Sequence, residues 1–144
     1  MKNTLKFTEE EVAAEIERLH QFFIDWFNGV VPKTAEAYAS FRSATATDFH
    51  IIPPGGALVG IDALAQGLYE AHNQRPGLDI QVKKMKIRQD MGDYCLATYE
   101  EWQLEQGDTE WKGRVSSALL SRNEAAPAGL MWHHVHETWL PDFQ

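Results

Sequence analysis

The chain has little of several features that mark specialised classes of protein. It has 1 cysteine, Cys95, among 144 residues, so no intrachain disulfide can form. No apolar run approaches the roughly 20 residues that span a bilayer, and the N-terminal segment has no apolar signal core. We therefore expect a cytoplasmic protein with no membrane partner.

Positive charge is also scarce. The chain has 13 Lys and Arg residues against 21 Asp and Glu residues, for a formal net charge of −8. A nucleic-acid-binding surface requires a basic excess that neutralises phosphates, so we expect no nucleic-acid partner. The stretch PPGGALVG, residues 53–60, has neither the Walker lysine nor the G-x-G-x-x-G spacing, and no G-x-S-x-G motif occurs. We expect no cofactor.

Apolar and aromatic residues are abundant, at 44% and 11%, which is enough for one hydrophobic core in a single domain over residues 1–144. The clearest helix begins at Thr8, which forms a T-x-x-E capping box with Glu11. Apolar residues then recur every three or four positions, as on one face of a helix. They are Val12, Ile16, Leu19, Phe23 and Trp26. The dipeptide Asn28-Gly29 is typical of a helix end.

Shorter helical patterns follow, at about 34–41 and from about Asp62 to the turn at 75–77. Between them, the segment DFHIIPPGGALVG, residues 48–60, predicts a strand, a Pro-Gly turn and a short extended arm. After Gly77 the pattern predicts four long strands: 79–90, 93–105, 110–122 and 130–140. Their short connections favour antiparallel neighbours, so helices precede an antiparallel sheet in an α+β fold.

The strand predicted at 79–90 contains a break in its alternation. Ile80 and Val82 are in phase with each other, whereas Met85 and Ile87 are out of phase with them by one residue. A bulge near Lys83–Lys84 would place all four apolar side chains on one face and bend the sheet.

Three segments together resemble a known superfamily: DFHIIPPGG followed by LVG in 48–60, KGRVSSALL in 112–120, and WHHVHETWL in 132–140. In order and spacing they resemble the nuclear transport factor 2-like (NTF2-like) superfamily, which includes ketosteroid isomerase and SnoaL-type cyclases, and in particular its small stand-alone members. The resemblance implies three N-terminal helices packed on a strongly curved, mostly antiparallel mixed sheet that forms a cone with an internal pocket. It also implies a homodimer through the outer sheet face.

The last predicted strand carries His133, His134 and His136 within four residues. Its counterpart in the superfamily has the pattern W-x-[IV]-x-H-x-H-x-S. The alignment of Trp132 with its Trp implies that alternate residues from Trp132 to Thr138 face the pocket and that the residues between them, including Glu137, face outward. Imidazoles titrate near neutral pH, so His136 and His134 are candidate catalytic residues, with Trp132 and Thr138 as ligand contacts. The alternative is a pair of core histidines held by hydrogen bonds.

Other candidate ligand contacts are Arg114, Tyr99, His50 and Trp26. Inside a cone, Arg114 would require a carboxylate, supplied by the ligand or by Glu101. The alternatives are a surface arginine paired with an acidic strand and, for Trp26, simple core packing.

We therefore predict a small-molecule-binding protein whose pocket is lined by His134 and His136 and takes an apolar or carboxylate-bearing molecule. One alternative is a cofactor-free isomerase, dehydratase or cyclase in which His136 and His134 transfer protons. Another is a purely structural dimerisation module. We expect no metal site, although His134 and His136 would suit a chelate with His50 or Glu101 as the third ligand.

Overall fold

The computed structural model describes residues 6–143, and within them three helices and six strands follow the predicted order. The elements are α1 (Glu9–Phe27), α2 (Ala35–Arg42), β1 (Thr45–Ile52), β2 (Val59–Gly60), α3 (Ile61–Glu70), β3 (Asp79–Asp90), β4 (Tyr94–Leu104), β5 (Lys112–Arg122), β6 (Leu130–Trp139) and the short 3₁₀ helix η1 (Pro141–Phe143). The predicted α+β class is confirmed.

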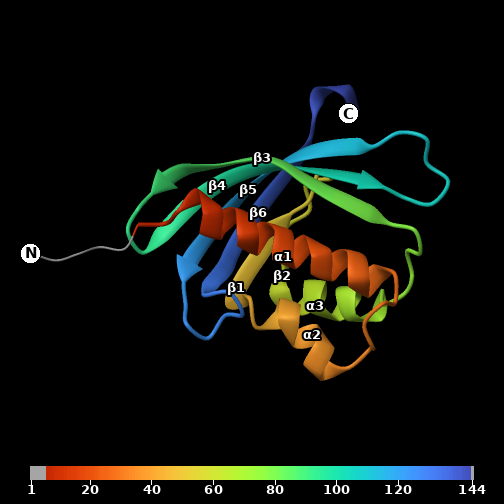
Figure 1. Ribbon diagram of the computed structural model, residues 1–144, viewed down its shortest axis with the longest axis horizontal. Coiled ribbons are helices and arrows are strands. Elements are labelled where there is room, and N and C mark those ends of the chain that lie inside the picture. The colour runs from red at the N-terminus through yellow and green to blue at the C-terminus, as the bar shows by residue number, and fades with distance from the viewer. Residues whose placement is uncertain (1–5, 144) are drawn as a thin grey trace, which may run out of the picture.

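The strands form one mixed sheet in the order β2-β1-β6-β5-β4-β3. Strands β3 to β6 are antiparallel neighbours, as predicted, whereas β1 pairs with β6 in parallel. The sheet is twisted but not strongly curled, so the predicted strong curvature is wrong (Figure 1). A physical reason lies at its centre, where β4 and β5 pair without interruption from Tyr94–Ser121 to Gln103–Lys112.

Helix α1 begins at the predicted capping box. The backbone N–H of Glu11 donates to Thr8 Oγ1 at 3.1 Å, and the backbone N–H of Thr8 donates to Glu11 Oε2 at 3.2 Å. The helix ends at Asn28, whose backbone N–H donates to the Ile24 carbonyl. These local bonds satisfy backbone groups that the helix itself leaves free at its two ends.

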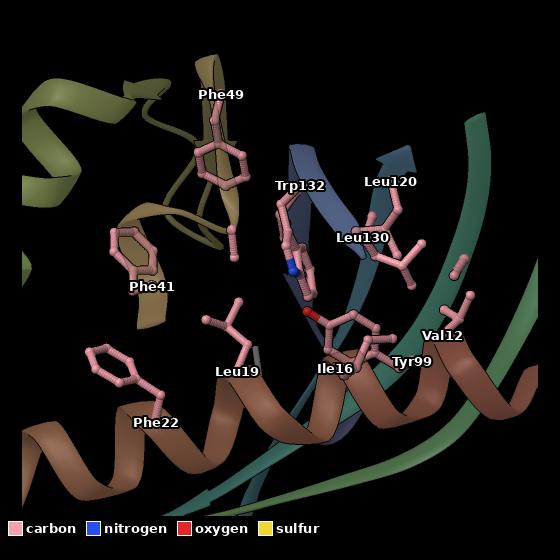
Figure 2. Packing of buried hydrophobic residues seen from close by; sticks show 14 of the residues in the cluster. Val12, Ile16, Leu19, Phe22, Phe41, Phe49, Tyr99, Leu120, Leu130 and Trp132 are labelled. Atoms are coloured by element: carbon pink, nitrogen blue, oxygen red, sulfur yellow. The ribbon is translucent and has the colours of Figure 1, made fainter. Parts of the chain in front are cut away.

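The core lies between α1 and the sheet. Figure 2 shows Val12, Ile16 and Leu19 on α1 pointing toward side chains of the sheet, among them Trp132 and Leu120. Helix α1 runs along one face of the sheet, and α2 and α3 lie beside its β1 end (Figure 1). The three α-helices therefore cover the same face of the sheet. Within residues 6–143 no α-helix covers the other face, called the open face below (Figure 1).

The bulge predicted in β3 is confirmed. Lys84 has a positive φ of 55°, and the register with β4 shifts between Lys83 and Lys86. As a result Ile80 is buried, and Met85 and Ile87 pack against the same core. No helix within residues 6–143 has both the length and the apolar character needed to cross a membrane.

Candidate functional site

A second bulge, in β6, changes which residues of the histidine segment face the helices. Leu120 pairs with Trp132, but Leu119 pairs with His134, so His133 is an extra residue in the register of β6 with β5. Beyond this bulge the alternation is reversed. Trp132 and Val135 are buried. Glu137, which was expected to point outward, faces the helices instead, and only 5% of it is exposed to solvent.

The predicted placement of His134, His136 and Thr138 inside a pocket is therefore wrong. His136 and Thr138 are exposed, and His134 is half-buried on the open face of the sheet. There the His134 ring lies 4.7 Å from that of His50, so His50 is also outside the inner space. Burial, followed by the charges of His50 and His136, lowers the pKa of His134, and its Nδ1 is buried without a hydrogen bond.

These histidines do not form the chelate considered above. Glu101 lies on the inner face of the sheet, opposite to His134 and His50. Among residues 6–143, no group of three His, Cys, Asp or Glu side chains is placed to hold a metal ion.

A space of about 290 Å³ lies between the inner face of the sheet and the three helices α1, α2 and α3. Of the predicted contacts, Trp132, Tyr99 and Arg114 line it. Trp26 does not, because it is fully buried in the core and donates from Nε1 to the Leu68 carbonyl at 2.7 Å. The indole N–H of Trp132 is fixed in turn by Glu15 Oε2 at 2.7 Å.

Most of the lining is apolar. The side chains come from all three helices and from β1, β2, β3 and β6: Leu19, Phe23, Phe27, Phe41, Phe49, Ile51, Val59, Leu64, Leu68, Ile80 and Val135. Most of the polar lining residues lie on the neighbouring strands β4, β5 and β6 and at one position of α1: His20, Tyr99, Glu101, Gln103, Arg114 and Glu137. Thr45 and Arg75 are the other two polar residues of the lining. The space thus has one apolar side and one polar side.

Glu101 is the centre of the polar side. Its Oε1 lies 2.9 Å from His20 Nε2, and its Oε2 accepts from Arg114 Nη2 at 2.8 Å and from the Gln103 amide. Burial alone would raise the pKa of Glu101, but His20 and Arg114 outweigh it and lower the pKa to about 2. Glu101 is therefore ionised at neutral pH.

His20 is held as a cation. Its Nδ1 lies 2.7 Å from the Ile16 carbonyl oxygen and its Nε2 lies beside Glu101, so both ring nitrogens face acceptors. Burial opposes the charged form, but Glu101 outweighs burial and raises the pKa of His20. The pairing that the sequence suggested between Arg114 and Glu101 is confirmed, with His20 as a partner that it did not suggest.

Glu137 has weaker partners than Glu101. Ser116 Oγ donates to its Oε2 at 3.3 Å, and Arg114 Nε lies 3.2 Å from the same oxygen but is not aligned for a hydrogen bond. Burial raises the pKa of Glu137 to about 7; the cation of Arg114 opposes this shift, and the charge of Glu101 adds to it. Burial also raises the pKa of Tyr99 well above its usual value, so its hydroxyl is neutral.

Sequence reasoning missed His20 and assigned Glu137 to the wrong face. A signal for His20 was present, because it follows Leu19 and lies four residues after Ile16 on the buried face of the amphipathic helix. For Glu137 the signal was the three-residue separation of Trp132 and Val135, since a regular strand cannot bury both.

Three helices on one face of a six-stranded mixed sheet, with an apolar space between them, define an α+β protein of the NTF2-like class. An NTF2-like protein of unknown function from Pseudomonas aeruginosa is 25% identical, with a TM-score of 0.79 over 90% of this chain and 98% of that one. An NTF2-like protein of unknown function from Pseudomonas putida is 16% identical, with a TM-score of 0.66 over 90% and 84%. The predicted NTF2-like resemblance is confirmed.

Within this class, the sequence pattern of the sucrose-6-phosphate phosphohydrolase C-terminal domain matches residues 12–141, and the chain belongs to this family. A curated relative, sucrose-phosphatase 2 from Nicotiana tabacum, is 24% identical over 131 residues, which cover 89% of this chain. The match covers only 30% of the length of that relative.

Proposed function

We propose that this protein binds a small, largely apolar molecule in the inner space, with one polar end of the molecule against Arg114 and Glu137. The observation that carries the proposal is the division of the lining into one apolar side and one polar side. Binding sites for small molecules are commonly lined by apolar and aromatic side chains, with a few polar groups that fix orientation.

The size of the space limits the ligand. Its volume of about 290 Å³ lies just below the range of about 300–1,000 Å³ typical of ligand sites. A molecule with one ring or a medium-length chain fits this range, whereas a dinucleotide does not.

The polar side also favours a binding role over a purely structural one. Buried ion pairs contribute little net stability, because the desolvation of the charges offsets their attraction. Glu101 has a full set of partners, but Glu137 and Arg114 have capacity left for a ligand. Groups of this kind in a concave apolar site mark a functional region.

Proton transfer is the second candidate function, with Glu137 in place of the histidines first considered. A carboxyl with a pKa of about 7 is suited to accept or donate a proton near neutral pH. Arg114 beside it would stabilise negative charge that develops on a substrate oxygen. A cofactor-free isomerase or lyase reaction on an apolar substrate would use this pair.

A homodimer through the open face of the sheet is also part of the proposal. Leu96, Val115 and Leu119 are half-buried side chains on the strands that make up this face. Apolar side chains on an open sheet face favour association with a second copy.

The binding proposal is tested by titrating the protein with octanol while intrinsic tryptophan fluorescence and the heat of binding are measured. We expect saturable binding at one site. Leu64→Trp, which fills the space from α3, should abolish it, whereas Met91→Trp, at a residue 56% exposed in the β3–β4 turn, should not. Absence of saturable binding, or equal binding by the two variants, would overturn the proposal.

A further inference from the structure

We propose that Arg114 and Glu137 together bind the carboxylate of an apolar acid, and that Glu137 takes up a proton from solvent when the acid binds. This inference rests on the proposed function and names the ligand class of the same site. It is carried by the unused hydrogen-bonding capacity of the two side chains and by the charges around them.

Arg114 has donors to spare. Its Nη2 is used by Glu101, whereas its Nε, although 3.2 Å from Glu137 Oε2, makes no aligned hydrogen bond. Its Nη1 makes no hydrogen bond to any group in the described part of the chain, residues 6–143. A guanidinium with free donors beside an apolar space matches the planar oxygens of a carboxylate.

Glu101 is not the group that changes protonation. His20, Gln103 and Arg114 all bond to its carboxylate, and these bonds favour its ionised form. An acid that entered the space would meet Glu101 with its oxygens already occupied. The change therefore falls on Glu137, which has the Ser116 hydroxyl as its hydrogen-bond partner.

The surroundings of Glu137 set the direction of the change. The titratable groups that face it are His20 from α1, Tyr99 and Glu101 from β4, and Arg114 from β5. The nearest β1 residues on the lining, Phe49 and Ile51, carry no charge. A ligand carboxylate adds a second negative charge beside Glu137, and a like charge nearby favours the neutral form of a carboxyl.

The charges then balance. With Glu137 protonated, the cations of His20 and Arg114 exceed the anion of Glu101 by one charge, which the ligand carboxylate neutralises. The proton comes from solvent and forms an O–H bond on Glu137, which donates to an oxygen of the ligand. No other bond forms or breaks, and the ligand stays ionised. The measured pKa of Glu137 in the free protein should lie near 7, so the proton is available without strong acid.

Calorimetry with octanoate, which stays ionised from pH 6 to 9, tests the proposal, with octanol as the uncharged match. Titrations in two buffers with different ionisation enthalpies give the number of protons taken up. We expect uptake approaching one proton per octanoate at pH 8, and affinity about tenfold weaker for each pH unit above the pKa of Glu137. Octanol should bind with the same affinity at pH 6 and pH 8.

Glu137→Gln is the matching variant, because the amide keeps a donor and carries no charge. It should bind octanoate at pH 8 about as tightly as the unaltered protein does at pH 6, with no proton uptake. If this variant does not fold, proton counting on the unaltered protein decides.

Three outcomes would overturn the inference. If octanol binds but octanoate does not, the proposed function stands, but the ligand is not an apolar carboxylic acid. Octanoate binding without proton uptake, or with uptake that persists in Glu137→Gln, removes the role of Glu137. If neither octanol nor octanoate binds, the inference fails together with the proposed function.

Discussion

Glu101 joins three elements of the fold within the polar side of the inner space. It lies on β4, pairs with His20 from α1 and with Arg114 from β5, and is 3% exposed. Loss of its charge would leave the buried His20 without its carboxylate partner and Arg114 with Glu137 alone. Removing one partner of a buried ion pair costs far more than the intact pair contributes.

We predict that Glu101→Gln lowers the free energy of unfolding at pH 7 by about 3–5 kcal/mol, measured by urea denaturation. Glu105→Gln is the control, because Glu105 directly follows β4 and pairs with Arg75, but its side chain is 51% exposed. That surface pair is expected to contribute about 0–1 kcal/mol. Equal losses in the two variants would contradict the central role of Glu101.

The effect of Glu101 depends on pH in a definite direction. Because its pKa is lowered from 4.5 to about 2 in the folded protein, the stability it contributes is complete above pH 4.5. That stability is lost as the pH falls from 4.5 through 2. The difference between the unaltered protein and Glu101→Gln should therefore narrow over this interval, as urea denaturation at several pH values would show.

At the scale of elements, the bulge in β3 requires an unfavourable backbone conformation at Lys84. Lys84 is not glycine, yet its φ of 55° lies in the left-handed region. This conformation costs an ordinary residue about 1–2 kcal/mol, and a β-branched residue more. The bulge persists because it keeps Met85 and Ile87 against the core.

We predict that Lys84→Val destabilises the protein by more than about 1 kcal/mol, whereas Lys84→Gly is neutral or slightly stabilising. Lys86→Val is the matched control, since Lys86 is exposed on the same strand and paired in regular register with Thr98. Val is favoured in strands, so this control should cost little. Thermal and urea unfolding measure all three. Equal effects of Val at 84 and at 86 would contradict the left-handed conformation.

The sequence predicted the bulge near Lys84 in β3 and missed the bulge at His133 in β6. In β3 the alternation is interrupted between Val82 and Met85. A regular strand would bury either Ile80 and Val82 or Met85 and Ile87 and would expose the other pair, so the bulge could be inferred. In β6 the break lies between Trp132 and Val135, and the residues beside it are histidines, which occur both in cores and on surfaces. The aligned family pattern favoured an uninterrupted strand, and it placed the histidines on the wrong face.

The polar side of the inner space was predictable only in part. The pairing of Arg114 with Glu101 was one of two possibilities expected for an arginine inside the fold, the other being a carboxylate of the ligand. The burial of Glu137 did not follow, because a glutamate on a strand usually faces water, and its position depends on a bulge several residues earlier. Helix starts and strand positions were predicted well because capping and alternation are local patterns. Which face of the sheet a strand residue occupies depends on the pairing of the whole sheet.

At the scale of the whole molecule, the two faces of the sheet differ in what covers them. Helices α1, α2 and α3 lie on one face, and within residues 6–143 no α-helix lies on the other, where η1 places Phe143 against Trp102 (Figure 1). On the open face, Leu96 pairs with Leu119, which in turn pairs with His134. This row of half-buried side chains crosses the middle of the sheet, where a second copy would contact it by symmetry.

We predict that the protein is a dimer through this row and that Leu119→Glu converts it to a monomer, because the interface would then bury an unpaired charge. Light scattering coupled to size exclusion, with a dilution series, measures the mass. Val30→Glu is the control, since Val30 follows α1 and is 70% exposed, so the dimer should be unaffected. Circular dichroism checks that both variants fold. If the unaltered protein is a monomer, or if the dimer persists in Leu119→Glu, the open face is not a dimer interface. Ligand binding in the inner space, on the opposite face of the sheet, would be unaffected by either result.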